Sequence, residues 1–227
     1  MEQRTVRRFR TRAILMHWLN FAPFIILLTT GALMFLDVPG ISGARQIGSV
    51  HQVAAAFFIG FPVLYLALDP RSALDFLKST FRWNKNDLAW LRGSPRYYFG
   101  GSTSAAPQGY LNGDQKLWQL IVVVCGLVLT VTGLVQWFFR LKIPVMAYQW
   151  VLLAHGAAFV VLLFAFIIHL YLVTMHPKSN ESLSAMLDGK ISESYAREHY
   201  SAWYEEEHSP HPVKRAPPSP TPPPTQT

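Results

Sequence analysis

The stretch that decides the fold is residues 148–173, which read YQWVLLAHGAAFVVLLFAFIIHLYLV. No Asp, Glu, Lys or Arg occurs in it, and its two histidines are His155 and His169. A helix needs roughly 20 mainly apolar residues to cross a hydrocarbon core about 30 Å thick. The stretch therefore predicts a helix that spans a membrane.

Three further segments meet the same criterion, at about residues 13–36, 50–68 and 117–139. The composition agrees, because 51% of the 227 residues are hydrophobic and only 15% are charged. We therefore predict an all-α membrane protein whose residues 13–175 form a four-transmembrane-helix bundle. The first segment is too long for a secretory signal peptide and no small-residue cleavage site follows it, so we expect it to be retained.

The basic residues predict the orientation of this bundle. Segments 1–12, 69–116 and 176–227 carry 5, 7 and 5 Lys or Arg, whereas the two opposite loops carry only Arg45, Arg140 and Lys142. Positive charge accumulates on the cytoplasmic side of membrane proteins, so both termini and the 69–116 loop are expected there. The net charge of +7 thus indicates topology rather than nucleic-acid binding.

Four non-membrane regions complete the predicted organisation. Residues 1–12 are a basic cytoplasmic N-terminus, and the cytoplasmic loop 69–116 alternates aromatic and basic residues, as segments at the headgroup level do. Residues 176–208 contain short amphipathic runs that predict a cytoplasmic amphipathic segment. Residues 209–227 are rich in proline and are expected to be disordered.

Four of the eight histidines fall inside the apolar segments: His17, His51, His155 and His169. Ionisable residues inside membrane helices are costly and usually mark a functional site. His155 and His169 are 14 residues apart, so at about 100° per residue they return to within about 40° of one face, about 21 Å apart along the axis. One helix face thus presents two ligands at two depths.

Matching the depths of the four histidines gives two pairs, His17 with His169 near the cytoplasmic side and His51 with His155 near the outside. Each pair can bind one iron axially through neutral imidazoles, which predicts two b-type haems. The single cysteine, Cys125, excludes an internal disulfide, a four-cysteine cluster and a CxxCH attachment site. The metal ligands are therefore expected to be the histidines.

Small residues are candidates for haem packing. Gly31 lies 14 residues after His17 and offers a side-chain-free surface at the depth of the other haem. Gly133 is a similar candidate on the third helix, although ordinary small-residue helix packing explains either glycine equally well. The remaining histidines are expected to be surface or helix-capping residues: His176, His199, His208 and His211.

A set of motifs resembles a known family in content and order. The motifs are RAILMHW at Arg12–Trp18, Thr30-Gly31, His51-Gln52, GYLNGDQK at Gly109–Lys116, Thr132-Gly133, the pair His155 and His169, and SLSAMLDGK at Ser182–Lys190. Over about residues 8–204 the chain resembles the cytochrome b (gamma) subunits of respiratory membrane-bound formate dehydrogenases, within the four-helix di-haem cytochromes b.

The resemblance implies a function in the bacterial inner membrane. Electrons would pass from a periplasmic iron-sulfur subunit, attached to a molybdenum or tungsten catalytic subunit, through the outer and inner haems to menaquinone or ubiquinone. Proton uptake for the quinone on the cytoplasmic side would contribute to the proton motive force, and the complex would form a higher oligomer. The chain itself has no Rossmann fingerprint, P-loop or activated nucleophile, so formate oxidation is expected in another subunit.

The resemblance also carries over a quinone site near the inner haem. It implies that Asn112 and Gln115 help to form this site, with Lys116 as a neighbour. The family motif generally has a small residue at the position of Asp114, so the pocket is expected to differ there. Without the resemblance, Asn112 and Gln115 would be read as ordinary residues of a helix start.

Three alternatives stay open at this stage. The first is the cytochrome b subunit of another respiratory complex, such as a hydrogenase, a thiosulfate reductase or another molybdoenzyme. The second is a histidine-lined metal or proton transporter, but such a protein is expected to place carboxylates near the histidines and the apolar segments contain none. The third is a haem-free membrane anchor, which leaves the matched histidine depths unexplained.

Overall fold

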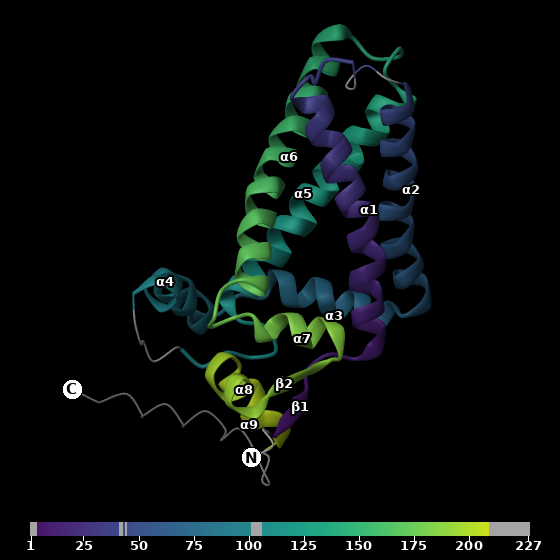
Figure 1. Cartoon of the computed structure of the whole chain (residues 1–227). Coiled ribbons are helices and arrows are strands. Elements are labelled where there is room, and N and C mark those ends of the chain that lie inside the picture. The colour runs from purple at the N-terminus through teal and green to yellow at the C-terminus, as the bar shows by residue number, and fades with distance from the viewer. Residues whose placement is uncertain (1–3, 41–42, 44, 101–105, 209–227) are drawn as a thin grey trace, which may run out of the picture.

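Four long helices dominate the computed structural model, which describes residues 4–40, 43, 45–100 and 106–208. They are long and apolar enough to cross a membrane: α1 (Thr11–Phe35), α2 (Arg45–Leu68), α5 (Gly113–Phe138) and α6 (Val145–Thr174). They run roughly along one direction, and the smaller elements gather at one end of them (Figure 1). All four helices begin earlier in the chain than the apolar segments that predict them.

The long helices form two hairpins. α1 packs mainly on α2 and α5 mainly on α6, with fewer contacts between α1 and α6. Cys125, Ala158 and Leu162 form a buried cluster between α5 and α6. The share of buried residues in the most apolar window is only 6% in α2 and 22% in α6, so most of the apolar surface is left for lipid, cofactors or partners.

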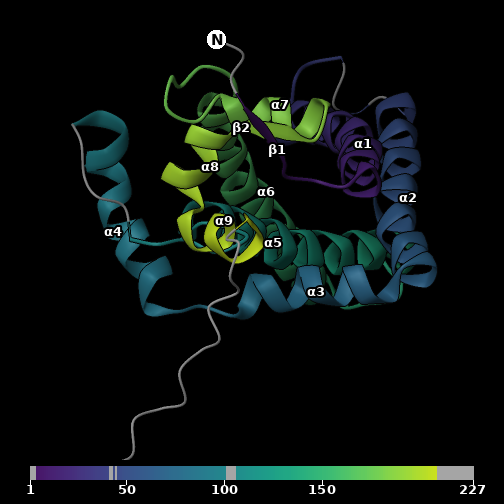
Figure 2. The same ribbon diagram turned by 90° about the horizontal axis from the view of Figure 1, so that it is seen from below.

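The 69–116 region, predicted as a loop, contains two helices, α3 (Pro70–Phe81) and α4 (Lys85–Phe99). Seen from below, α3 lies across the end of the bundle and α4 extends to one side (Figure 2). Side-chain hydrogen bonds at the N-cap residues explain where the two helices begin. Asp69 accepts a hydrogen bond from the Ser72 amide, and Asn84 forms a reciprocal capping box with Asp87.

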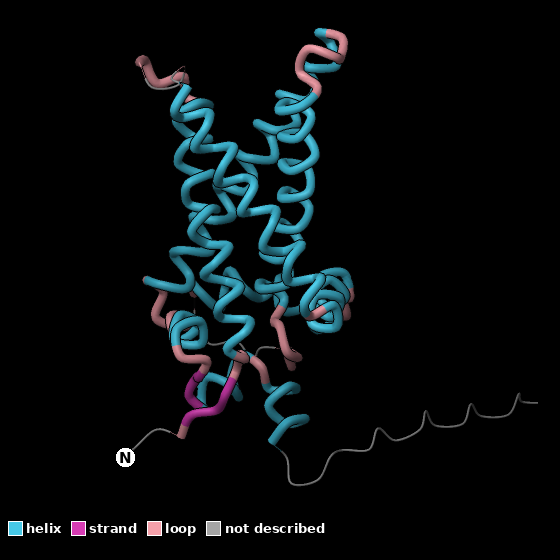
Figure 3. Tube along the Cα trace, turned by 90° about the vertical axis from the view of Figure 1, so that its right-hand side faces the viewer, coloured by secondary structure: helices cyan, strands magenta, loops and turns pink. Residues whose placement is uncertain are grey.

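The predicted amphipathic segment and the chain start combine in a small unit that we call the cap. It consists of β1 (Thr5–Arg7), α7 (Glu181–Leu187), β2 (Lys190–Ser192), α8 (Glu193–His199) and α9 (Ser201–His208). The two strands pair antiparallel, with Val6 opposite Ile191, and they appear in magenta beside the start of α1 in Figure 3. The all-α prediction missed this sheet, because three-residue strands are too short to show a period-2 pattern.

The cap has its own apolar core, separate from the helix hairpins. Val6, Ile191, Ala196, Tyr200 and Trp203 are among its buried residues. Gly189 has a φ of +82°, and a Cβ there would lie 2.7 Å from the Phe9 carbonyl oxygen, so the turn into β2 requires glycine. The predicted disordered tail, residues 209–227, lies outside the described residues.

Candidate functional site

The first histidine pair lies toward the end of the bundle that is opposite the cap. His51 belongs to the second turn of α2 and His155 to the third turn of α6, and the two side chains lie near each other. A Cβ on Gly31 would lie 3.7 Å from His51 Cε1, and one on Gly133 would lie 3.5 Å from His155 Cε1. Both predicted packing glycines therefore face this pair.

We call this pair the outer pair because it lies far from the cap, and each of its histidines has a threonine partner on the other helix of its hairpin. Thr30 Oγ1 lies 2.7 Å from His51 Nδ1, and Thr132 Oγ1 lies 2.8 Å from His155 Nδ1. Both threonines directly precede the glycines that face the rings. A bond at Nδ1 leaves Nε2 as the ring nitrogen that can bind a metal.

The second pair lies nearer the cap. His17 is on α1 and His169 is on α6, and these two side chains also lie near each other. His169 is stacked on Trp118, with ring centroids 4.3 Å apart and planes within 5°. His17 lies parallel to Phe21 at 6.3 Å, and its Nδ1 is buried without a hydrogen-bond partner in the described structure.

The donor set fits haem better than a bare metal ion. In the described ranges, no group of three or more His, Cys, Asp or Glu side chains could hold a metal ion. Each pair of imidazoles would supply the two protein ligands that a b-type haem iron takes, and a bound haem would supply one-electron redox chemistry there. At Gly31 and Gly133 no side chain stands between the helix backbone and the two outer rings.

A cavity of about 340 Å³ lies between Gln52 of α2, the residue after His51, and the far end of α5. It is lined by Gln52, Gln136, Trp137, Phe138, Arg140, Leu141 and Lys142. The Nε2 of Gln136 is buried and has no hydrogen-bond partner within the described part of the chain. Amide and cationic donors of this kind bind carboxylates, including the propionates that haem carries.

Asn112 and Gln115 form the N-terminal cap of α5. Asn112 accepts a hydrogen bond from the Gln115 amide at 2.9 Å, and the Gln115 side chain accepts one from the Asn112 amide at 3.3 Å. Gln115 Nε2 also donates to the Tyr200 hydroxyl of the cap at 2.7 Å. Both residues therefore have a structural role here, and any ligand at Gln115 would compete with Tyr200 or use its second amide proton.

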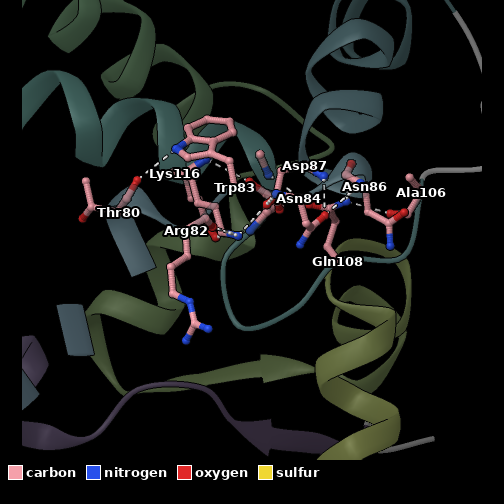
Figure 4. Close-up of polar contacts among 12 residues, drawn as sticks. Thr80, Arg82, Trp83, Asn84, Asn86, Asp87, Ala106, Gln108 and Lys116 are labelled. Atoms are coloured by element: carbon pink, nitrogen blue, oxygen red, sulfur yellow. Dashed lines mark hydrogen bonds and ion pairs between the residues drawn. The ribbon is translucent and has the colours of Figure 1, made fainter. Parts of the chain in front are cut away.

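Lys116 is engaged in a buried ion pair that fixes α4 against α5. Its Nζ lies 2.7 Å from Asp87 Oδ2, and the two side chains are only 12% and 2% exposed. Figure 4 shows this contact together with the Asn84 cap and with Gln108, which lies between the two helix starts. Gln108 Oε1 accepts from the Gly113 amide at 3.0 Å. This geometry gives Lys116 a partner other than a quinone.

Asp114, where the resemblance implies a departure from the family motif, binds three side chains of α4. Its carboxylate accepts hydrogen bonds from Trp90 Nε1 at 2.7 Å, Ser94 Oγ at 2.6 Å and the Tyr98 hydroxyl at 3.1 Å. A half-buried carboxylate with three donors is well satisfied. Asp114 therefore anchors α4 to the start of α5.

Two histidines expected at the surface or at helix caps are buried. His199 is 1% exposed and stacks on Tyr195, and its Nε2 lies 3.0 Å from the Tyr97 hydroxyl. His176 is 5% exposed and its Nε2 donates to the Tyr98 carbonyl. Burial lowers the pKa of His199 and raises the pKa of Tyr97. The His199 imidazole and the Tyr97 phenol are therefore both neutral near pH 7.

The cap also buries a guanidinium among aromatic rings. Arg8 is 4% exposed, and its Cζ lies 4.0 Å from the Tyr200 ring centroid, 4.3 Å from that of Tyr110 and 4.5 Å from that of Trp203. Cation–π contacts of this kind stabilise a desolvated guanidinium. Burial lowers the pKa of Arg8, and the contacts join the chain start to α9.

Sequence reasoning missed Thr30, Thr132 and Trp118 as neighbours of the histidines. A signal for the threonines was present, because Thr-Gly occurs on the first helix of each hairpin, 21 and 23 residues before His51 and His155. Threonine is common in apolar helices as a back-bonded residue, so the doublet alone does not identify a partner.

Comparison with known proteins adds to this geometry. Residues 8–189 match the family model of prokaryotic cytochrome b561. The chain is 31% identical over 127 residues to the cytochrome b556 subunit of the nitrate-inducible formate dehydrogenase of Escherichia coli K12, covering 54% of this chain and 56% of that relative. The chain thus spans about half the length of this relative.

Two other relatives match over more of their length. The formate dehydrogenase cytochrome b556 subunit of Haemophilus influenzae is 25% identical over 213 residues, covering 88% of this chain and 82% of the relative. A second such subunit of Escherichia coli K12 is 24% identical over 212 residues, covering 89% and 93%. The family match covers most of the chain and its four apolar helices, so this multi-pass membrane protein belongs to the prokaryotic cytochrome b561 family and binds b-type haem.

Proposed function

We propose that the chain is the membrane cytochrome b subunit of a respiratory formate dehydrogenase. In this role it carries electrons from a periplasmic iron-sulfur subunit, attached to a molybdenum or tungsten catalytic subunit, through two b-type haems to a quinone reduced near the cytoplasmic side. The observation that carries the proposal is the presence of two histidine pairs at two depths of one bundle. The names of the similar subunits from Escherichia coli and Haemophilus influenzae supply formate as the electron source.

In the proposed assignment His51 and His155 hold the outer haem, and His17 and His169 hold the inner one. Bound haem iron supplies one-electron redox chemistry. The protein supplies neutral ligands, a low-dielectric surrounding and two sites that lie along one face of α6. Gln52, Gln136 and the cations of the outer cavity are placed to bind carboxylates beside the outer pair.

The charge distribution supports a cytoplasmic location for both ends of the chain. The basic segments 4–12, 70–99 and 178–197 belong to the start of α1, to α3 and α4, and to the cap. These elements gather at one end of the bundle (Figure 1), and positive charge favours the cytoplasmic side. The inner pair is the pair nearer this end.

A quinone site at this end rests on Asn112 and Gln115. Reduction of a quinone by two electrons requires two protons, which polar groups near the cytoplasmic water can deliver. Proton uptake on this side, with electrons that arrive from the other side, would contribute to the proton motive force. Gln115 donates a hydrogen bond to Tyr200 of the cap, and this is the contact that a quinone oxygen would replace or share.

The test is a dithionite-reduced minus oxidised spectrum with a pyridine haemochrome assay on the detergent-purified native complex. Two b-type haems per chain are expected, and formate added to the complex should reduce both. No haem, or one haem, would contradict the proposed assignment. Reduction by hydrogen or another donor in place of formate would assign the chain to a different respiratory complex.

The quinone step is tested separately with Gln115→Leu. Formate should still reduce both haems in this variant, whereas the reduced haems should no longer be reoxidised by added quinone. Tyr200→Phe is the control for the cap, because it removes the hydroxyl that Gln115 contacts and keeps the Gln115 amide. Normal reoxidation in Gln115→Leu would remove Gln115 from the quinone site.

A further inference from the structure

The two hydrogen bonds between threonine and histidine have a defined direction. Thr30 Oγ1 lies 2.7 Å from the Ile26 carbonyl oxygen, and Thr132 Oγ1 lies 2.6 Å from the Val128 carbonyl oxygen. A contact of this length between two oxygens requires a proton between them, and only the hydroxyl has one to give. The hydroxyl therefore donates to the carbonyl four residues earlier.

The histidines must then be the donors in the other contact. Since the single hydroxyl proton is already used, Thr30 can only accept from His51 Nδ1, and Thr132 can only accept from His155 Nδ1. Both rings are thereby held as the tautomer with a proton on Nδ1 and a lone pair on Nε2. This is the form in which Nε2 binds a metal.

The inner pair lacks this arrangement. His17 Nδ1 is buried and unpartnered, and the His169 ring makes a stacking contact with Trp118. Among residues 4–40, 43, 45–100 and 106–208, no hydrogen bond joins either ring to another side chain or to the backbone. The two pairs therefore differ in one specific interaction, present at both outer ligands and absent at both inner ones.

We propose that Thr30 and Thr132 are positioning residues that fix the tautomer of His51 and His155 and lower the reduction potential of the outer haem. A ligand imidazole that donates its Nδ1 proton to an acceptor becomes more basic, and a more basic ligand stabilises ferric over ferrous iron. Because the hydroxyl is itself polarised by its bond to the carbonyl, its strength as an acceptor increases. The inference rests on the proposed assignment of the histidine pairs.

The contribution of the two threonines lowers the reduction potential of the outer haem and leaves that of the inner haem unchanged. In the proposed direction of electron flow, from the outside to the quinone end, the threonines thus favour transfer inward. The hydroxyls act on the iron only through the histidines, and their influence is expected at the outer site alone.

The test is a spectroelectrochemical titration of the full complex carrying Thr30→Val, Thr132→Val or both. Valine keeps the shape of threonine and removes the acceptor. We expect one of the two redox waves to shift to a more positive potential in each single variant and further in the double variant. A tenfold change in the one-electron equilibrium constant corresponds to about 59 mV. His51→Ala, which is expected to retain only the inner haem, identifies the wave that belongs to the outer site.

Two controls distinguish the hydroxyl from a general packing effect. Thr30→Ser and Thr132→Ser keep the hydroxyl and should restore the original potential. Thr174→Val removes a hydroxyl that bonds the Leu170 carbonyl at 2.6 Å without a histidine partner, and should leave both waves unchanged. Loss of one haem in the valine variants with retention in the serine variants also supports the positioning role.

The inference is wrong if neither wave moves, if both waves move equally, or if the serine variants behave like the valine variants. These outcomes are separable from failure of the proposed function. A wild-type complex with two haems and unshifted waves in the valine variants contradicts only the role of the threonines. A wild-type complex without two haems contradicts the ligand assignment itself.

Discussion

The four intramembrane imidazoles divide between two hairpins and two depths. α6 contributes one histidine to each pair, whereas α1 and α2 contribute one each and α5 contributes none. Each pair is therefore completed only when α6 packs beside the first hairpin. Removing one ligand should affect one depth and leave the other intact.

Substitution of single histidines tests the pairing. We expect His51→Ala and His155→Ala to lose one haem, and His17→Ala and His169→Ala to lose the other, because six-coordinate binding needs both axial ligands. Haem content and redox titration of the purified variants would measure this. His208→Ala, which changes an exposed residue of α9, should retain both haems. Two haems in any of the four ligand variants would rule out the pairing.

A second residue-scale prediction concerns Gly113, the first residue of α5. A Cβ there would lie 2.5 Å from the Asp87 carbonyl oxygen, whereas a Cβ on Gly126 of the same helix would meet nothing within 4 Å. Gly113→Ala should destabilise the protein by about 1–3 kcal/mol, because the contact forces the backbone of α4 away. Gly126→Ala should cost nothing measurable. Thermal unfolding in detergent would compare the two.

The histidines could be predicted from the sequence because an imidazole inside an apolar run is rare and its spacing along a helix is fixed. The partners of those histidines could not. Whether Thr30 meets His51 depends on the rotation of α1 against α2, which one sequence does not fix. The burial of His199 was likewise hidden, because its surroundings come from Tyr97, about a hundred residues earlier in the chain.

Polar contacts order α4, the second short helix of the 69–116 region. α4 is held against α5 by the ion pair of Lys116 with Asp87 and by the three donors to Asp114. These contacts lie at the start of α5, beside the proposed quinone residues. Rigid polar support at this point fixes the position of Asn112 and Gln115 relative to the bundle.

Breaking the buried ion pair should therefore destabilise this element. Lys116→Met leaves the Asp87 carboxylate, 2% exposed, without its cation, and such a change costs about 3–5 kcal/mol. Lys78→Met is the matched control, since Lys78 and Asp75 form a pair at 3.7 Å with side chains 64% and 76% exposed. Unfolding in detergent should separate the two variants clearly. Equal stability would show that Asp87 is solvated in the native complex.

The apolar runs predicted the four long helices, whose hydrophobicity is a strong local signal. α3 and α4 were missed although Asp69-Pro70 and Asn84 with Asp87 are helix-start signals, because a basic and aromatic composition was read as an interfacial loop. The strands β1 and β2 could not be predicted, since each has three residues and pairs with a segment almost the whole chain away.

At the scale of the whole molecule, the cap closes one end of the bundle by joining the two ends of the described chain. Its core combines Val6 of β1 with Tyr195, Tyr200 and Trp203 of the last helices, and Gln115 links this core to α5 through Tyr200. Conditions that unfold the cap should therefore also destabilise the start of α5.

The buried His199 makes the cap sensitive to acid. Burial lowers its pKa from 6.5 in the folded state, against the opposing attraction of Glu198, so the unfolded chain binds a proton more readily. The stability that this group contributes is complete above about pH 6.5 and is lost as the pH falls toward the lowered folded pKa. The protection factors of the α8 amides, which correct for the intrinsic exchange rate at each pH, should fall as the pH is lowered from 7 to 5.

His199→Gln should reduce this pH dependence, because glutamine cannot be protonated in that range. His208→Gln, at an exposed position on α9, serves as the control and should keep the wild-type profile. A wild-type profile in His199→Gln would assign the acid sensitivity to other groups.

The distribution of ligands among the helices also has a consequence for biogenesis. His17 and His51 emerge from the ribosome with the first hairpin, long before α6, which brings both His155 and His169. Under the proposed assignment, the nascent chain holds two half-sites and no complete one until its last spanning helix has entered the bilayer. Cofactor loading is then a checkpoint on complete membrane insertion, because a chain truncated before α6 has no complete pair of ligands for either haem.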